Sequence, residues 1–139
     1  MGTGKENWRI LSGLIIHPAI SQFDMPFSEY DMECIEKAKK IIDADISRHL
    51  SISFIAATTG IGTTKLKKGF KDLYGIGLFG YLRRQRMIQA EKLVITTNKT
   101  IKEISKISGF LHRANFITSF SSYYGVSPAR YRKTYSAKQ

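Results

Sequence analysis

The sequence predicts an all-α fold of seven helices, arranged as two helix-turn-helix units joined by a long spacer helix. The first observation is a degenerate repeat: Ile52, Ile55 and Gly60 recur 49 positions later as Ile101, Ile104 and Gly109, and Leu66, Phe70, Tyr74, Gly75 and Tyr81 recur 50 positions later as Phe116, Phe120, Tyr124, Gly125 and Tyr131. The offset grows by one residue directly after the first glycine, where a turn absorbs an insertion without rotating a packed face. Two copies are too few for a solenoid, which needs three or more stacked repeats.

The second observation is the distribution of charge. The chain has 139 residues, 42% of them hydrophobic, which is enough for one domain or for one domain with an appendage. Its net charge of +11 is uneven, since residues 1–45 hold 5 Lys/Arg against 8 Asp/Glu and residues 46–139 hold 17 against 3. A basic region with helix-turn-helix spacing favours a polyanionic partner such as DNA, although charge alone also fits ribosomal and membrane-surface proteins.

The chain begins with a segment, residues 1–27, that we interpret as a tail or linker; the remnant of an effector domain is the alternative interpretation. It has no firm hydrophobic period, and Pro18 and Pro26 interrupt any long helix. Ser28 and Asp31 then form a capping-box pattern in which an acid replaces the usual Glu or Gln. We expect the first helix to run from about Glu29 to Ser47 and the DNA-binding domain to span residues 28–136.

The first helix-turn-helix is expected over residues 51–75. Ser51 caps a helix over residues 52–58, Gly60 ends it, and a second helix opens at Gly62 and Thr63 and ends at Gly75. The spacer helix follows over residues 78–96, with an apolar stripe made of Phe79, Leu82, Met87, Ala90, Leu93 and Val94. A helix of roughly 18 residues is about 27 Å long, close to one turn of B-DNA once flanking turns are added.

The second helix-turn-helix is expected over residues 100–125. Thr100 and Glu103 form a capping box before a helix over residues 101–107, residues 108–110 make the turn, and a longer helix over residues 112–124 ends at Gly125. Ser127 and Pro128 then open a last helix that reaches about Tyr135.

The second helix of each unit, called the reader helix below, supplies the candidate DNA contacts, because this helix enters the major groove. The base-reading candidates are Thr63, Thr64, Lys67 and Lys68 in the first copy and Arg113, Ala114, Asn115 and Thr118 in the second. Lys and Arg donate to guanine, Asn binds adenine, and Thr or Ala contacts a thymine methyl. The phosphate-binding candidates are Lys71, Arg83, Arg84, His112, Arg130 and Lys133. A solvated helix face is the alternative interpretation.

Other features favour structural roles. Phe70, Phe79, Phe110, Phe116 and Phe120 have the spacing of core residues. No catalytic motif and no metal-ligand spacing is present around the histidines, and Cys34 is the one cysteine, so neither an enzyme nor a cofactor or metal site is expected. No secretory signal or bilayer-spanning run is evident, which favours a cytoplasmic, nucleoid-associated protein with no membrane partner.

The repeated segments resemble the DNA-binding domain of the AraC/XylS transcription regulators over about residues 31–135. The resemblance is carried by Ile55-Ala56, Gly60, Leu66-Lys-Lys-Gly-Phe70, Tyr74-Gly75 and Phe79-Gly-Tyr81-Leu82 in the first copy, and by Ser108-Gly-Phe110, Phe116, Phe120, Tyr124-Gly-Val-Ser-Pro128 and Tyr131-Arg132 in the second. It implies double-stranded promoter DNA as partner, RNA polymerase contact and transcriptional activation. The first-copy segments look most like regulators of siderophore genes, such as the pyochelin and yersiniabactin regulators.

The sequence also departs from this family pattern. Thr118 stands where many relatives carry Arg, and Leu111-His112 replaces a small polar capping pair, so base reading in the second copy is expected to depend on Arg113. Residues 1–27 are too short for the effector domain of most relatives, so an effector would act through a domain not present here, whether the chain is a fragment or a short family member. A helical module that binds an acidic protein, or an RNA-binding protein, remains the alternative.

Overall fold

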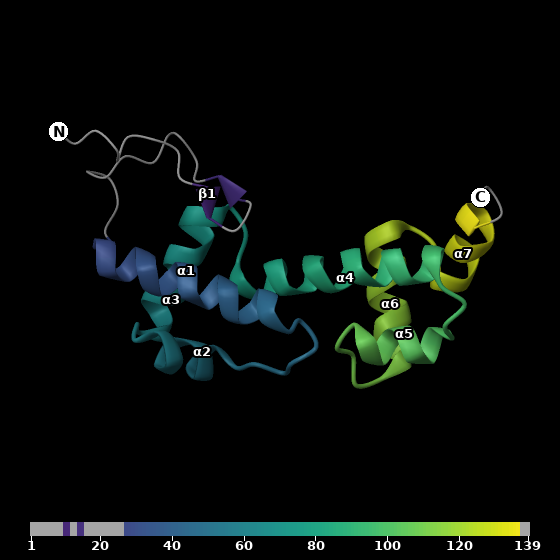
Figure 1. The fold of residues 1–139 in the computed structure, drawn as a ribbon, viewed down its shortest axis with the longest axis horizontal. Helices are drawn as coiled ribbons and strands as arrows, with labels where there is room; N and C mark the ends of the chain where they lie inside the picture. The colour runs from purple at the N-terminus through teal and green to yellow at the C-terminus, as the bar shows by residue number, and fades with distance from the viewer. Residues whose placement is uncertain (1–9, 12–13, 16–26, 137–139) are drawn as a thin grey trace. The chain divides into compact units, whose positions relative to one another are not determined.

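The computed structural model describes residues 10–11, 14–15 and 27–136, and it contains seven helices within that part of the chain. The helices form two compact units (Figure 1). Unit 1 comprises residues 1–44 and 50–81, and unit 2 comprises residues 45–49 and 82–139. The all-α tandem fold expected from the repeat is confirmed, and each unit is described in turn.

Unit 1 starts with α1 (Glu29–Ala44), whose expected capping box is present. The Asp31 amide donates to Ser28 Oγ at 3.1 Å, and the Ser28 amide donates to Asp31 Oδ2 at 3.0 Å. The expected C-terminus at Ser47 is wrong by three residues. The Asp45 carboxylate accepts a hydrogen bond from the Ser47 amide at 3.0 Å. This local turn replaces the backbone hydrogen bonds that would continue the helix beyond Ala44.

The first helix-turn-helix consists of α2 (Ile52–Thr59) and α3 (Thr63–Tyr74), with bounds within one residue of those expected. Leu66 and Phe70 on α3 are fully buried. Gly69 lets α3 approach α1 closely, because a Cβ there would lie 2.3 Å from Cδ1 of Ile35. Any larger residue at position 69 would force the Ile35 side chain out of its present place between the two helices.

Helix α4 (Leu78–Thr96) has the expected bounds, but one of its expected core residues is wrong. Phe79 is 47% exposed, whereas Leu78, Tyr81 and Leu82 are buried. At 100° per residue, Phe79 is turned about 100° from Leu78 and leaves the face that the other three share. The remaining aromatic residues of the expected core set are buried or half-buried.

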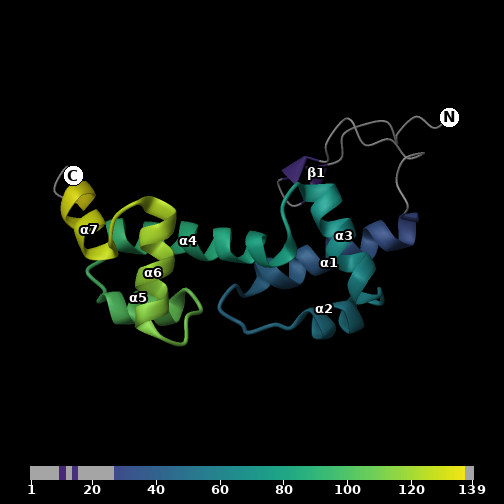
Figure 2. The same ribbon diagram turned by 180° about the vertical axis from the view of Figure 1, so that it is seen from behind.

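Unit 2 contains most of α4 together with α5 (Ile101–Ile107), α6 (Arg113–Tyr124) and α7 (Pro128–Ser136). Its core is built from side chains of α4, α5, α6 and α7, namely Met87, Ala90, Val94, Ile104, Phe116, Phe120 and Tyr131. Figures 1 and 2 show α6 crossing α5 in this unit. Helix α6 begins at Arg113, so His112 is its N-cap and not its first helical residue.

Two short strands were not expected. β1 (Ile10–Leu11) and β2 (Leu14–Ile15) pair antiparallel, with Ile10 opposite Ile15. Residues 1–9, 12–13 and 16–26 lie outside the described residues, so the interpretation of residues 1–27 as a tail stays a prediction. Among the described residues, no helix is long and apolar enough to cross a membrane.

The structural repeat reaches further back than the sequence repeat. The Tyr81 hydroxyl donates to the Asp43 carboxylate of α1 in unit 1, and the Tyr131 hydroxyl donates to the Glu91 carboxylate of α4 in unit 2. Since Tyr81 and Tyr131 are equivalent, α1 and α4 are equivalent as well. Each reader helix therefore packs in a unit of three helices, closed by a tyrosine from the next helix.

Candidate nucleic-acid interface

The reader helix of unit 1, α3, has an apolar inner face and a polar outer face. Leu66, Phe70 and Leu73 are buried on the inner face. All five polar residues predicted to face outward are exposed: Thr63, Thr64, Lys67, Lys68 and Lys71. The helix contains one acid, Asp72, so its outer face is strongly cationic.

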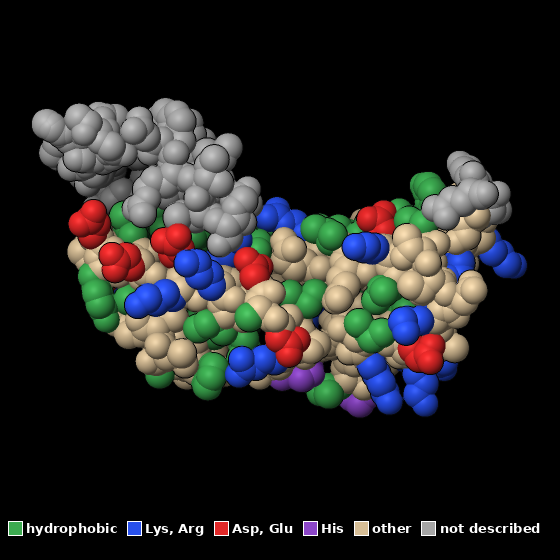
Figure 3. Space-filling model, viewed as in Figure 1, with side chains coloured by type: hydrophobic (Ala, Val, Ile, Leu, Met, Phe, Trp, Pro, Cys, Tyr) green, Lys and Arg blue, Asp and Glu red, His purple; other side chains and the backbone are tan. Residues whose placement is uncertain are grey.

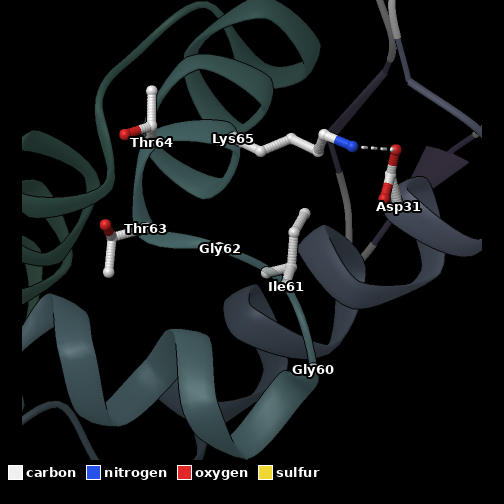
Figure 4. Close-up of a pocket in the computed structure, with 7 residues that line it drawn as sticks. All are labelled: Asp31, Gly60, Ile61, Gly62, Thr63, Thr64 and Lys65. Atoms are coloured by element: carbon white, nitrogen blue, oxygen red, sulfur yellow. Dashed lines mark ion pairs between the residues drawn. The ribbon is translucent and has the colours of Figure 1, made fainter.

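Two lysines of α3 have carboxylate partners. Lys68 Nζ lies 3.2 Å from Asp72 Oδ2. The Lys68 side chain is 63% exposed, so this pair is easily exchanged for a phosphate or a base edge. Lys65 Nζ lies 3.2 Å from Oδ2 of Asp31, which is 11% exposed. Figure 4 shows Lys65 reaching from α3 to Asp31 while Thr63 and Thr64 point away from that ion pair.

Asp31 is the most strongly held carboxylate near this reader helix. The hydrogen bond from the Ser28 amide lowers the pKa of Asp31; burial opposes this effect, and Lys65 adds to it. Lys65 is thus paired with a carboxylate of α1, and Lys67, Lys68 and Lys71 form the rest of the cationic surface of α3.

An open hollow of about 550 Å³ lies at the start of α3 (Figure 4). It is lined by Asp31 and by residues 60–65, which are mostly turn backbone and polar side chains. No sequence pattern predicted a hollow of this volume. Its polar lining differs from the mostly apolar walls of typical small-molecule pockets.

The reader helix of unit 2, α6, presents a different surface. Phe116 and Phe120 are buried, whereas His112, Arg113, Ala114, Asn115 and Thr118 are all exposed, as predicted. The helix contains no acid, and Arg113 is its one Lys or Arg. A contact surface on α6 therefore depends on one guanidinium, one amide and small apolar or hydroxyl groups.

The predicted phosphate contacts outside the reader helices are placed unequally. Arg83 on α4 and Arg130 and Lys133 on α7 are exposed, whereas Arg84 is half-buried. Figure 3 shows blue side chains with a few red ones over unit 2, and red and blue ones mixed over α1. Helix α1 holds five acids against three lysines, so it is a less favourable contact for phosphate than α3 or α7.

Arg86 has a structural role that was not predicted from the sequence. Its Nε donates to the Ile46 carbonyl at 2.6 Å, and its Nη2 donates to the Arg48 carbonyl at 3.0 Å. Its guanidinium carbon lies 5.9 Å from the centre of the Phe110 ring, and burial lowers its pKa. Arg86 thus ties residues 46–48 to the turn before α6 and is not available as a phosphate clamp.

Helical spacing in the sequence could have distinguished Arg86 from the nearby Arg83 and Arg84. Leu82 and Ala90, four residues before and after it, are buried, so Arg86 lies toward the core side of α4. Among the described residues, no group of three or more His, Cys, Asp or Glu side chains is arranged to hold a metal ion.

Comparison with known families supports this geometry. A family model described as a helix-turn-helix domain matches residues 55–134. The chain is 29% identical over 105 residues to the HTH-type transcriptional activator AarP of Providencia stuartii. The matched region covers 76% of this chain and 78% of AarP. The matched region spans only 33% of the regulatory protein PocR of Salmonella typhimurium and 49% of the transcriptional activator and DNA repair enzyme AdaA of Bacillus subtilis.

Solved structures share the fold. The C-terminal domain of the response regulator yesN from Fusobacterium nucleatum is 31% identical, with a TM-score of 0.66, over 70% of this chain and 95% of that domain. The DNA-binding domain of AdpA, solved in complex with a target DNA, is 22% identical, with a TM-score of 0.72, over 77% of this chain and 96% of that one. With its two reader helices, its matching family model and these relatives, the chain belongs to the AraC/XylS family of transcription regulators.

Proposed function

We propose that this chain binds double-stranded promoter DNA sequence-specifically and regulates transcription through α3 and α6. The observation that carries the proposal is the pair of reader helices, each with buried apolar residues on one side and exposed, mostly polar residues on the other. AdpA, whose domain shares this fold, is described in complex with its target DNA.

The predicted residue roles follow from side-chain chemistry. Lys67, Lys68 and Arg113 donate to guanine edges, Asn115 binds adenine, and Thr63, Thr64, Ala114 and Thr118 contact thymine. Lys71, Arg83, Arg84, His112, Arg130 and Lys133 neutralise phosphates. Arg84 contributes less than the exposed Arg83, because its side chain is half-buried.

The length of α4 suggests the spacing of the DNA sites. Its 19 residues span about 28 Å at 1.5 Å per residue. We propose that one chain reads two half-sites about 10–10.5 base pairs apart on one face of the duplex. Activation through RNA polymerase is the favoured outcome, since AarP is described as an activator. We further propose that the domain acts by binding and not by catalysis, in the cytoplasm.

A selection from a random duplex library followed by mobility-shift titration tests the proposal. The expected result is a selected duplex that binds the chain at least about a thousandfold more tightly than its scrambled version. Inserting five base pairs between the half-sites should then abolish the advantage of the second half-site. Equal affinity for selected and scrambled DNA would contradict the proposal, and preferential binding of an RNA hairpin or an acidic protein would favour the alternatives.

A further inference from the structure

The two helix-turn-helix units differ by one residue in the turn before the reader helix. In unit 1 the Ile61 amide donates to the Ala56 carbonyl at 3.1 Å, and in unit 2 the Phe110 amide donates to the Ser105 carbonyl at 3.0 Å. Both bonds follow a left-handed glycine and span five residues, so Ile61 and Phe110 are equivalent. In unit 1 the N-cap of the reader helix is Gly62, one residue after Ile61. In unit 2 the N-cap is His112, two residues after Phe110. Leu111 is therefore the inserted residue.

Leu111 is also turned outward. The residue before an N-cap often packs on the fourth helical residue, which for α6 is Phe116. Here Phe110 takes that place, with its ring centre 5.4 Å from that of Phe116. Ile61 is 8% exposed, whereas Leu111 is 74% exposed, the highest value among the large hydrophobic side chains of the described residues. The insertion adds an apolar side chain to the outer surface and contributes nothing to the core.

The position of Leu111 indicates what covers it. It directly precedes the N-cap His112 and lies one turn or less from Arg113 and Ala114, which are exposed at the same end of α6. This end of a reader helix approaches the base edges in the major groove. Leucine has no hydrogen-bonding group, and the apolar group that the major groove offers is the C5 methyl of thymine.

We propose that Leu111 is a specificity-determining residue that contacts a thymine methyl at the edge of the second half-site. This inference depends on the proposed function, and it adds a contact outside the helix proper. Together with Ala114 and Thr118 it gives α6 a preference for thymine-rich DNA, in contrast to the lysine-rich α3.

Replacing thymine by deoxyuridine tests the proposal, because it removes the methyl and keeps the base pairing. Each thymine of the selected second half-site is replaced in turn, and the dissociation constant is measured for the full chain and for Leu111→Ala. At one position the intact chain should lose about three- to fivefold in affinity, as expected for one buried methyl. Leu111→Ala should lose a similar factor on the thymine duplex and be insensitive to deoxyuridine there.

Two controls make the outcome decisive. Ile88→Ala truncates an apolar side chain of α4 that is 49% exposed, and it should keep the full response to deoxyuridine. Thermal unfolding of Leu111→Ala should match that of the intact chain. The inference is overturned if the selected duplex binds specifically but Leu111→Ala retains every deoxyuridine response or has unchanged affinity. Absence of any specific duplex would instead overturn the proposed function.

Discussion

The Tyr81 hydroxyl donates to the Asp43 carboxylate at 2.5 Å and thereby fastens the first turn of α4 to α1. Tyr131 makes the equivalent bond to Glu91 and fastens α7 to α4. Both carboxylates precede the first matched positions of the repeat that is visible in the sequence, Ile52 and Ile101, and one is Asp whereas the other is Glu. The two units have thus kept the same closing interaction while the acid changed.

Replacing Tyr131 by Phe should destabilise the protein by about 1–2 kcal/mol, because a hydrogen bond to a carboxylate is lost while the ring packing stays. Burial and the bond to Glu91 also raise the pKa of Tyr131 to about 12. Urea unfolding measures the first effect, and ultraviolet titration of Glu91→Gln should show the pKa of Tyr131 returning toward 10. Tyr123→Phe, at a tyrosine that is 42% exposed, is the control and should change stability by less than about 0.5 kcal/mol.

Replacing Lys39 by Met should leave stability unchanged or raise it. Lys39 is 1% exposed. Its Nζ lies 3.0 Å from Asp43 Oδ2 and 5.0 Å from the centre of the Tyr81 ring. Met87 is the buried residue at the equivalent position of α4, if Asp43 is aligned with Glu91. Lys39→Met removes a buried cation and keeps a side chain of similar size. Asp43 is not left as an uncompensated buried charge, because its side chain is 35% exposed and keeps the bond from the Tyr81 hydroxyl. Thermal unfolding measures the change, and Lys39→Ala is the matched control.

Lys39→Ala should cost about 2–4 kcal/mol, because it removes the same charge and leaves a cavity. A strong loss of stability in Lys39→Met would contradict the prediction and would show that the charge itself holds α1 in place.

Replacing Gly109 by Ala should destabilise unit 2 far more than replacing Gly125 by Ala. Both glycines have nearly the same positive φ, +88° and +86°, so both substitutions carry a similar backbone strain of about 1–2 kcal/mol. A Cβ at Gly109 would lie 2.8 Å from Arg86 Nε and 2.9 Å from Ser47 Cα, whereas nothing lies within 4 Å of one at Gly125.

The added crowding at Gly109 should cost about 1–3 kcal/mol more, since Arg86 is held by two backbone carbonyls and cannot move aside freely. Urea unfolding of both variants measures the difference. Equal losses would show that residues 46–48 yield easily and that Arg86 does not fix the turn.

Replacing Arg113 by Ala should reduce affinity for the preferred duplex by about 1–3 kcal/mol and relax selection at one base pair. Replacing Arg83 by Ala should weaken binding to all sequences alike and lower the salt slope by about one ion. Titrations of the selected and scrambled duplexes at several salt concentrations distinguish the two effects. If Arg113→Ala kept the full sequence preference, α6 would contact the backbone only.

The stabilising effect of the Asp31 carboxylate should disappear in acid. Its pKa is lowered in the folded protein from an ordinary value of 3.8, chiefly by the Ser28 amide. The unfolded chain therefore binds the proton first as pH falls, so the contribution is complete above about pH 5 and is lost as pH passes below the folded pKa. The melting temperatures of the intact chain and of Asp31→Asn should differ at pH 7 and converge toward pH 2–3.

Glu29→Gln, at an exposed acid of the same turn, is the control for the change in net charge. A difference between the intact chain and Asp31→Asn that persisted unchanged to pH 2.5 would assign the effect to packing and not to the ionised carboxylate.

The sequence determined the order, type and approximate bounds of the helices, because helix ends are set by local groups. Ser51, Thr100 and the glycines at 60, 75 and 125 act on neighbouring backbone only, and the structure places each where the sequence predicts it. The exposed face of each reader helix was equally predictable, since the buried positions of Leu66, Phe70, Phe116 and Phe120 recur at helical spacing.

Tertiary structure alone decided which of several similar side chains are committed to the fold. Arg83 and Arg86 carry the same charge three residues apart, but Arg86 is the one that donates to the carbonyls of Ile46 and Arg48, which lie about 40 positions away in the chain. The burial of Lys39, the exposure of Phe79 and the outward turn of Leu111 likewise depend on neighbours from other helices. Hydrogen bonding within a helix is local, whereas the choice of a packing partner depends on segments that meet only when the chain folds.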